Sequence, residues 1–153
     1  MLAHSVATGP HRDTIANAHF TNLQLDSKLR ELAVVLTTAK LGSVYEHTHH
    51  SRISEKFGVE EKQREWIREV VKDGGMGGVL KAVESLKGEA LFTDKEKVLL
   101  VLVENVLERK DVGESLWKGA RRFFGEREMV EIVTLVVSRI LSQDSSVVRS
   151  IRD

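Results

Sequence analysis

Apolar side chains recur at every third or fourth position of this chain, which is the spacing of a helix. The 153 residues include only one proline, so almost nothing in the sequence would interrupt helices. The proline, Pro10, stands where the first turn of a helix tolerates it. Beyond it, no proline interrupts the apolar recurrence. The pattern therefore predicts an all-α fold. Typical of the spacing are Leu29, Leu32, Ala33, Leu36 and Ala39.

Start and stop signals predict where the helices begin and end. Asp26 is a candidate N-cap, Gly42 and Gly58 are candidate C-terminal stops, and Thr93 with Glu96 has the spacing of a capping box. The glycine-rich segment 73–78 lacks the GK[ST] of a phosphate loop, so we interpret it as a connection between helices. The helices expected from these signals cover residues 11–22, 26–42, 43–57, 60–71, 78–86, 93–110, 113–124 and 127–150.

The composition excludes several classes of function. The chain is long enough to bury a core of its own, and we interpret residues 1–153 as a single helical domain. Its 23 basic and 23 acidic side chains give a net charge of zero, which argues against a nucleic-acid partner or a polybasic membrane surface. Cysteine is absent, so disulfides, thiolate metal sites and thiol-based catalysis within this sequence are excluded.

The distribution of apolar residues predicts a cytoplasmic protein. No apolar run approaches the roughly 20 residues that span a bilayer. The first residues lack the basic and apolar regions of a signal peptide. We therefore expect no membrane partner.

Two segments predict a homo-oligomer. Residues 98–106 and 132–137 are apolar around most of a helix circumference. A helix of that kind has to be covered on several sides, by a large core or by a second subunit. In a chain of 153 residues we expect the second subunit to provide part of that cover.

The residues that could carry out chemistry gather between positions 31 and 58. Three of the six histidines, His47, His49 and His50, follow directly on Tyr45 and Glu46. In a helix, Glu46 and His50 share one face because they are four residues apart. A carboxylate beside an imidazole is typical of general acid/base catalysis, since histidine transfers protons near neutral pH.

Other interpretations of this segment remain open. Ser43 and Glu46 also have the spacing of a capping box, in which Glu46 would bond the backbone at the start of the helix. The histidines could then be ordinary, partly exposed helix residues. A metal site is a third interpretation, but Glu46 and His50 supply two ligands and no other histidine-rich segment offers a third. We therefore expect no metal and no other cofactor.

The residues from Glu31 onward resemble the carboxymuconolactone decarboxylase family, which includes the alkylhydroperoxidase D-like proteins. In the thiol peroxidase branch of that family, a Glu, two Cys and a His follow one another at fixed spacing, and those positions fall here on Glu31, Ser43, Glu46 and His50. Both cysteines are replaced, so this chain is similar to the cysteine-less branches. Tyr-Glu-His-Thr-His-His at 45–50, followed by Phe-Gly-Val at 57–59, matches the pattern of those branches. The motif region is 26–59, and segments 91–107 and 123–137 resemble later helices of the family.

The resemblance implies a fold, an assembly and an activity. The fold is a helical bundle of the alkylhydroperoxidase D-like type, assembled as a trimer or hexamer. Cysteine-less members resemble the lactone decarboxylase, so the activity is a cofactor-independent, decarboxylase-like proton transfer on a small cyclic, aromatic or lactone-type acid. The alternative is a non-catalytic, oligomeric small-molecule-binding protein of the same fold.

The same resemblance suggests roles for individual residues. His50 is the main proton donor or acceptor, Glu46 shares the proton, and Glu31 supports His50 from the preceding helix. A substrate carboxylate needs a cationic contact. The residues that we expect to bind substrate are Tyr45, His47, His49, Ser43 and Arg52, and further candidate cations are Lys40, Arg30 and Arg139.

Overall fold

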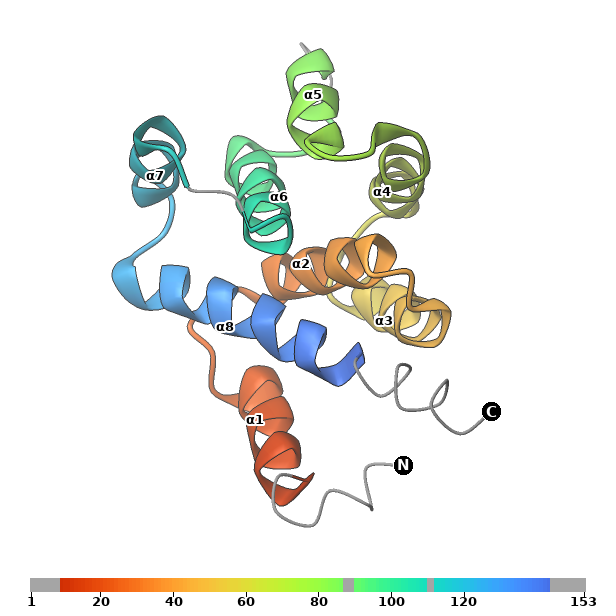
Figure 1. The fold of residues 1–153 in the computed structure, drawn as a ribbon, viewed down its shortest axis with the longest axis vertical. Helices are drawn as coiled ribbons and strands as arrows, with labels where there is room; N and C mark the ends of the chain where they lie inside the picture. The colour runs from red at the N-terminus through yellow and green to blue at the C-terminus, as the bar shows by residue number, and fades with distance from the viewer. Residues whose placement is uncertain (1–8, 87–89, 110–111, 144–153) are drawn as a thin grey trace.

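The computed structural model describes residues 9–86, 90–109 and 112–143, and within them the only regular elements are helices. None of these described helices is both long and apolar enough to cross a membrane. Figure 1 shows α1 (Gly9–Thr21), α2 (Ser27–Lys40), α3 (Val44–Lys56), α4 (Glu61–Gly74), α5 (Gly78–Ser85), α6 (Asp94–Leu107), α7 (Glu114–Arg121) and α8 (Glu126–Gln143). The prediction of an all-α fold is confirmed.

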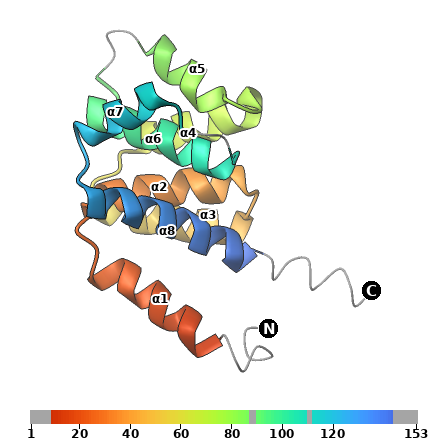
Figure 2. The same ribbon diagram turned by 60° about the vertical axis from the view of Figure 1, so that its left-hand side comes forward.

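Helix α2 is the centre of the bundle. It contacts α3, α4, α6 and α8. In both ribbon views α2, α3 and α8 form one layer, α4, α6 and α7 form the next, and α5 and α1 lie at opposite ends (Figures 1 and 2). Ten residues of α2 are buried in succession, from Leu29 to Thr38. Side chains on every face of α2 are therefore inside the protein.

The predicted caps set the beginning and end of the central helices. The Asp26 carboxylate accepts the backbone N–H of Lys28 at 2.9 Å. Thr93 and Glu96 form the reciprocal capping box, with the Thr93 N–H donating to the Glu96 carboxylate at 2.8 Å. Gly42 follows α2 with φ +67° and Gly58 follows α3 with φ +82°. Because only glycine adopts such angles without strain, both helices end where the sequence indicates.

Several helix ends differ from the prediction by a few residues. Helix α4 continues past Val71 to Gly74, and Gly75 then turns the chain with φ +55°. Helix α6 ends at Leu107 rather than Lys110, because Arg109 already adopts φ +53°. Helix α8 begins at Glu126, and its predicted end at residue 150 lies outside the described residues. The glycine-rich segment does join two helices, α4 and α5, as expected.

The prediction that two helices need cover from a second subunit is wrong for one of them. In α6, residues 99–104 are all buried within the single chain, because α2, α5, α7 and α8 surround that helix. Helix α8 is different. It buries Ile132, Leu135 and Val136 but leaves an apolar row exposed on its opposite side. The members of this α8 row are Val130, Val133, Val137 and Leu141.

Candidate functional site

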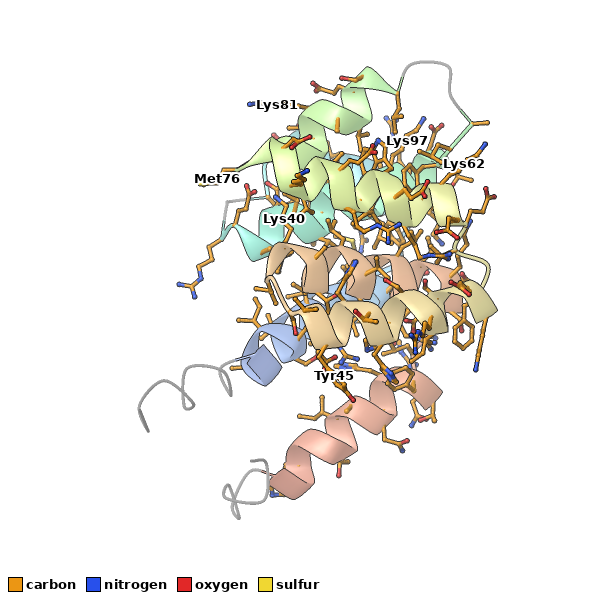
Figure 3. The ribbon with its side chains drawn as sticks, turned by 90° about the vertical axis from the view of Figure 1, so that its right-hand side faces the viewer. Lys40, Tyr45, Lys62, Met76, Lys81 and Lys97 are labelled. Carbon is orange, nitrogen blue, oxygen red and sulfur yellow. The ribbon has the colours of Figure 1, made fainter. Side chains whose placement is uncertain are left out.

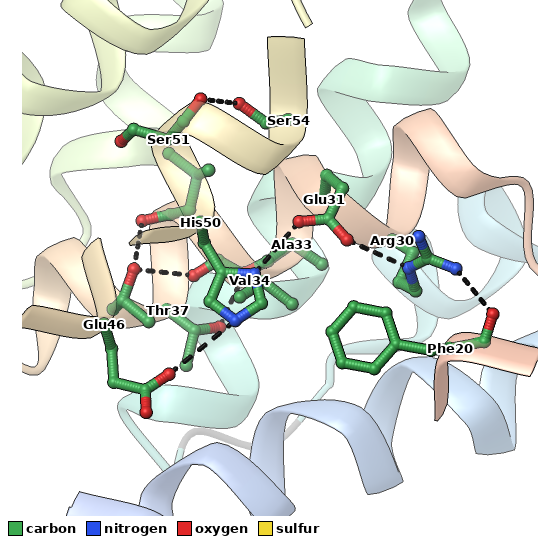
Figure 4. Close-up of polar contacts among 12 residues, drawn as sticks. Phe20, Arg30, Glu31, Ala33, Val34, Thr37, Glu46, His50, Ser51 and Ser54 are labelled. Atoms are coloured by element: carbon green, nitrogen blue, oxygen red, sulfur yellow. Dashed lines mark hydrogen bonds and ion pairs between the residues drawn. The ribbon is translucent and has the colours of Figure 1, made fainter. Parts of the chain in front are cut away.

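A buried histidine between two carboxylates forms the centre of the candidate site. Nδ1 of His50 lies 3.0 Å from Oε2 of Glu31, and Nε2 lies 3.6 Å from Oε2 of Glu46. The side chains of Glu31 and His50 are 0% and 2% exposed, whereas that of Glu46 is 32% exposed. Figure 4 shows the imidazole between the two carboxyl groups. The structure therefore brings together Glu31, Glu46 and His50, the three residues predicted to be catalytic.

The seam between α2 and α3 positions these side chains. The short turn at residues 41–43 joins the two helices, so α3 folds back along α2. Glu31, Val35 and Thr38 lie on one face of α2, at successive turns. His50 contacts Glu31, and His47 one turn earlier on α3 contacts the Val35 carbonyl. Both histidines consequently belong to the same seam.

Arg30 neutralises Glu31. Its Nε donates to Oε1 of Glu31 at 3.0 Å, and the Arg30 side chain is 5% exposed. The guanidinium lies 5.1 Å from the ring centroid of Phe20 and 4.9 Å from that of Phe57, which places it in two cation–π contacts. Glu31 thus has a partner for each oxygen, Arg30 on one side and His50 on the other.

Arg139 of α8 is the cation that faces Glu46. Its Nη1 lies 3.3 Å from Oε2 of Glu46, and its side chain is 12% exposed. Burial lowers the pKa of Arg139, while the nearby carboxylates of Glu46 and Glu31 oppose that shift. The Nε of Arg139 is buried, and no described residue accepts its hydrogen bond. A hydrogen-bond donor in this state is a natural contact for an anionic ligand.

His19 of α1 lies against α8, next to Ser138 and Arg139. Nδ1 of His19 lies 3.3 Å from the hydroxyl of Ser138. Burial lowers the pKa of His19, and the positive charge of Arg139 lowers it further, while Glu131 opposes the shift. His19 is therefore neutral near pH 7.

Phe20 of α1 stacks on the His50 ring. Its phenyl ring is parallel to the His50 imidazole within 8°, with centroids 6.1 Å apart, and Phe20 is 41% exposed. The backbone carbonyl of Phe20 accepts a hydrogen bond from Arg30 at 3.3 Å. His50 itself is 2% exposed, so its ring has little direct contact with solvent.

Of the residues predicted to bind substrate, His49 contacts the His50 ring and the others lie farther along or outside the seam. Ser43 and His47 instead line a separate cavity at the turn end of the seam. Tyr45 is 79% exposed, projects from α3 (Figure 3) and stacks on His49 with centroids 6.3 Å apart. His49 meets His50 edge-on at 5.6 Å. Arg52 is exposed on α3.

Lys40 pairs with two carboxylates at the end of α6 and not with the residues around His50. Its Nζ pairs with Glu104 at 2.5 Å and with Glu108 at 2.8 Å, both in or just after α6. These contacts hold the end of α2 against α6. Among the described residues, Arg30 and Arg139 are the cations that pair with Glu31 and Glu46. Phe20 and His19 were not among the sequence candidates, because α1 has no apolar periodicity that would predict which of its residues are buried.

The capping interpretation of Glu46 is wrong. Ser43 does occupy the N-cap position of α3, but its side chain makes no capping hydrogen bond. The Glu46 carboxylate turns away from the start of the helix to His50 and Arg139. Within the described residues, no group of three or more His, Asp or Glu side chains is arranged to hold a metal ion.

Comparison with models of protein families, with curated proteins and with solved structures gave no match. The resemblance carried by residues 26–59 therefore stays a prediction.

Proposed function

We propose that the chain is a cofactor-independent acid/base enzyme that moves a proton on a small cyclic, aromatic or lactone-type carboxylic acid. The observation that carries the proposal is the orientation of His50. One ring nitrogen is directed at a buried carboxylate and the other at a partly exposed one. This is how proteins fix the tautomer of a histidine that accepts or donates a proton.

The contact with Glu31 determines which nitrogen of His50 is reactive. The Glu31 carboxylate accepts a hydrogen bond, so Nδ1 carries the proton in the neutral ring. The lone pair is then on Nε2, which lies 3.6 Å from Glu46. Glu46 is close enough to exchange a proton with Nε2 after a small shift and exposed enough to pass it to solvent. In this scheme Glu31 is a positioning residue, while Nε2 of His50 and Glu46 touch the substrate.

The charges of the site favour an acidic substrate. Arg30 and Arg139 balance Glu31 and Glu46, so the cluster is neutral while His50 is neutral. Protonation of His50 leaves one positive charge in excess. A substrate carboxylate restores the balance, and the unpartnered Nε of Arg139 is a donor that it can reach.

A decarboxylation at this site needs only a proton. When the bond between the carboxylate and the adjacent carbon breaks, carbon dioxide leaves and the electron pair remains on the substrate carbon. Protonated His50 then gives its Nε2 proton to that carbon, and the Glu46 carboxylate relays a proton from solvent back to the ring. Binding the acid in a water-poor site assists the loss of its charge.

The family, the assembly and the cellular location are proposed from the resemblance of residues 26–59 to the carboxymuconolactone decarboxylase family. We propose membership of the cysteine-less branch of the carboxymuconolactone decarboxylase family, a trimer or hexamer, and a cytoplasmic location. The alternative is a non-catalytic, oligomeric small-molecule-binding protein of the same fold. The burial of His50 under Phe20 favours that alternative, since it closes direct access to the ring.

A panel of small acids tests the proposal. The purified chain is incubated in D₂O with aromatic, cyclic and lactone-type carboxylic acids, and ¹H and ¹³C NMR follow carbon dioxide release and deuterium uptake at carbon. The proposal expects catalysed exchange or decarboxylation with at least one acid, and the same preparation after heat denaturation is the control. Binding of acids without any exchange across the panel would support the non-catalytic alternative.

A further inference from the structure

A cavity of about 240 Å³ lies at the turn end of the seam between α2 and α3, separate from the polar cluster at His50. It is bounded by the end of α2, the turn that contains Ser43, the first turn of α3 and the C-terminal half of α4. Ala39, Val44 and Val71 give it an apolar wall. Its volume is below the roughly 300–1,000 Å³ of pockets for drug-sized molecules, so it suits a smaller ligand.

The charged residues of this cavity all have the same sign. Arg68 and Lys72 line it from α4, where they share a face because they are four residues apart. None of its described lining residues is acidic. Arg68 lies 4.0 Å from Glu61 in a pair whose side chains are 50% and 68% exposed, so that carboxylate competes weakly for it. The electrostatic preference of the cavity is consequently for an anion.

His47 adds a neutral polar group to the wall. Its Nδ1 lies 3.3 Å from the Val35 carbonyl and 3.4 Å from the Thr38 hydroxyl. Because a carbonyl only accepts, Nδ1 carries the proton and Nε2 is an acceptor. Nε2 is buried, and no described residue donates to it. Burial lowers the pKa of His47 against the opposing hydrogen bond to Val35, and Arg68 lowers it further, so the ring is neutral.

The backbone at the start of α3 also favours an anion in this cavity. Ser43 is the N-cap residue, but its side chain does not cap the first free N–H groups of the helix, and Glu46 is turned toward His50. The positive end of the α3 dipole therefore faces the side of the cavity formed by Ser43 and Val44. This adds to the attraction that Arg68 and Lys72 exert on an anion.

We propose that this cavity is a binding site for a small carboxylate with an apolar body, held by Arg68 and Lys72 at its anionic end and by Ala39, Val44 and Val71 along its body. The proposal does not depend on catalysis at His50, because none of these described residues forms a hydrogen bond or ion pair with Glu31, Glu46 or His50. Ser43 and His47 belong to the wall of this cavity and lie away from the His50 ring.

Benzoate is the probe that tests the site, and benzamide is its neutral counterpart of the same shape. Calorimetric titration of the full chain should show saturable binding of benzoate, with benzamide weaker by roughly tenfold or more. The double variant Arg68→Gln, Lys72→Gln should lose a similar factor. Lys62→Gln changes a lysine at the other end of α4 (Figure 3) and should bind benzoate like the wild type.

Two further measurements locate the bound molecule. Benzoate near the ring should raise the pKa of His47, followed by the imidazole C–H signals in ¹H NMR, because a nearby negative charge favours the protonated ring. His50→Asn should retain benzoate binding, which separates this site from the proposed catalytic centre. Equal binding of benzamide and benzoate, unchanged affinity in the double variant, or loss of binding in His50→Asn would overturn the proposal.

Discussion

Glu31 on α2 and His50 on α3 are joined by a contact of 3.0 Å between a carboxylate oxygen and a ring nitrogen, with both side chains almost completely removed from water. Each side chain satisfies a buried polar group that would otherwise lack a partner. The contact joins the central helix to the helix that carries the histidines. It therefore has a structural effect as well as the catalytic effect that we propose.

The structural effect predicts a difference between two variants of His50. His50→Ala removes the donor to Glu31 and leaves a cavity, so we expect the free energy of unfolding to fall by about 1–3 kcal/mol. His50→Asn places an amide N–H near the position of Nδ1 and should lose less. Urea denaturation followed by circular dichroism measures both.

His49→Ala is the matched control, because His49 is the neighbouring residue on α3 and is exposed. We expect its free energy of unfolding to stay within about 0.5 kcal/mol of the wild type. Equal losses in His49→Ala and His50→Ala would show that the Glu31 contact contributes nothing specific to stability.

Local signals were sufficient to predict the helices. Asp26, Gly42, Gly58 and the Thr93 capping box act within one turn of the chain, so their effect is visible in the sequence. The burial of α6 was not visible, because the same apolar pattern fits a helix covered by its own chain and one covered by a second subunit. Only the arrangement of α2, α5, α7 and α8 distinguishes the two.

The candidate site was predictable in part for the same reason. The pairing of Glu46 with His50 follows from helical spacing, and Glu31 came from the family resemblance. Arg139 lies 93 residues from Glu46 in the sequence, and Phe20 reaches His50 from α1. Contacts of that range depend on how helices pack and have no local pattern in the sequence.

The free energy of unfolding should decrease as the solution is acidified from pH 7.5 to pH 5. Burial lowers the pKa of His19 and His47 below their ordinary value of 6.5. The unfolded chain therefore takes up these protons first as the pH falls through 6.5, which stabilises the unfolded state. The contribution is complete above that pH and is lost below it. Urea denaturation at a series of pH values gives the slope.

The variant His19→Gln, His47→Gln removes both titrating groups and serves as the comparison. Its free energy of unfolding should depend less steeply on pH over the same range. A slope identical to that of the wild type would show that other groups cause the dependence, and a rise in stability on acidification would contradict the assignment directly.

The exposed α8 row predicts self-association. Val130, Val133, Val137 and Leu141 are 62%, 39%, 42% and 58% exposed, and they lie along one side of the helix. Light scattering coupled to size exclusion should give a mass of about 35 kDa or more, at least twice the 17.2 kDa of one chain. Val133→Glu with Val137→Glu should reduce the mass to that of one chain, since charges in this row oppose burial.

Leu80→Glu is the control for that pair, because Leu80 is 43% exposed on α5 at the far end of the bundle. It should leave the mass unchanged. A single-chain mass for the wild type at micromolar concentration would show that the α8 row does not mediate assembly, and an assembly that survives both glutamates would place the interface elsewhere.

Turnover of an acid identified in the NMR panel tests whether His50 and Glu46 transfer the proton, when His50→Asn, Glu46→Gln and the double variant are compared with the wild type. His50→Asn keeps a donor for Glu31 but has no Nε2, so a loss of activity there reports on proton transfer rather than on folding. We expect each single variant to lower kcat by roughly 10²–10⁴-fold and the double variant to be little worse than the poorer single, since the two groups act as a unit. Turnover by folded His50→Asn at the wild-type rate would contradict this expectation.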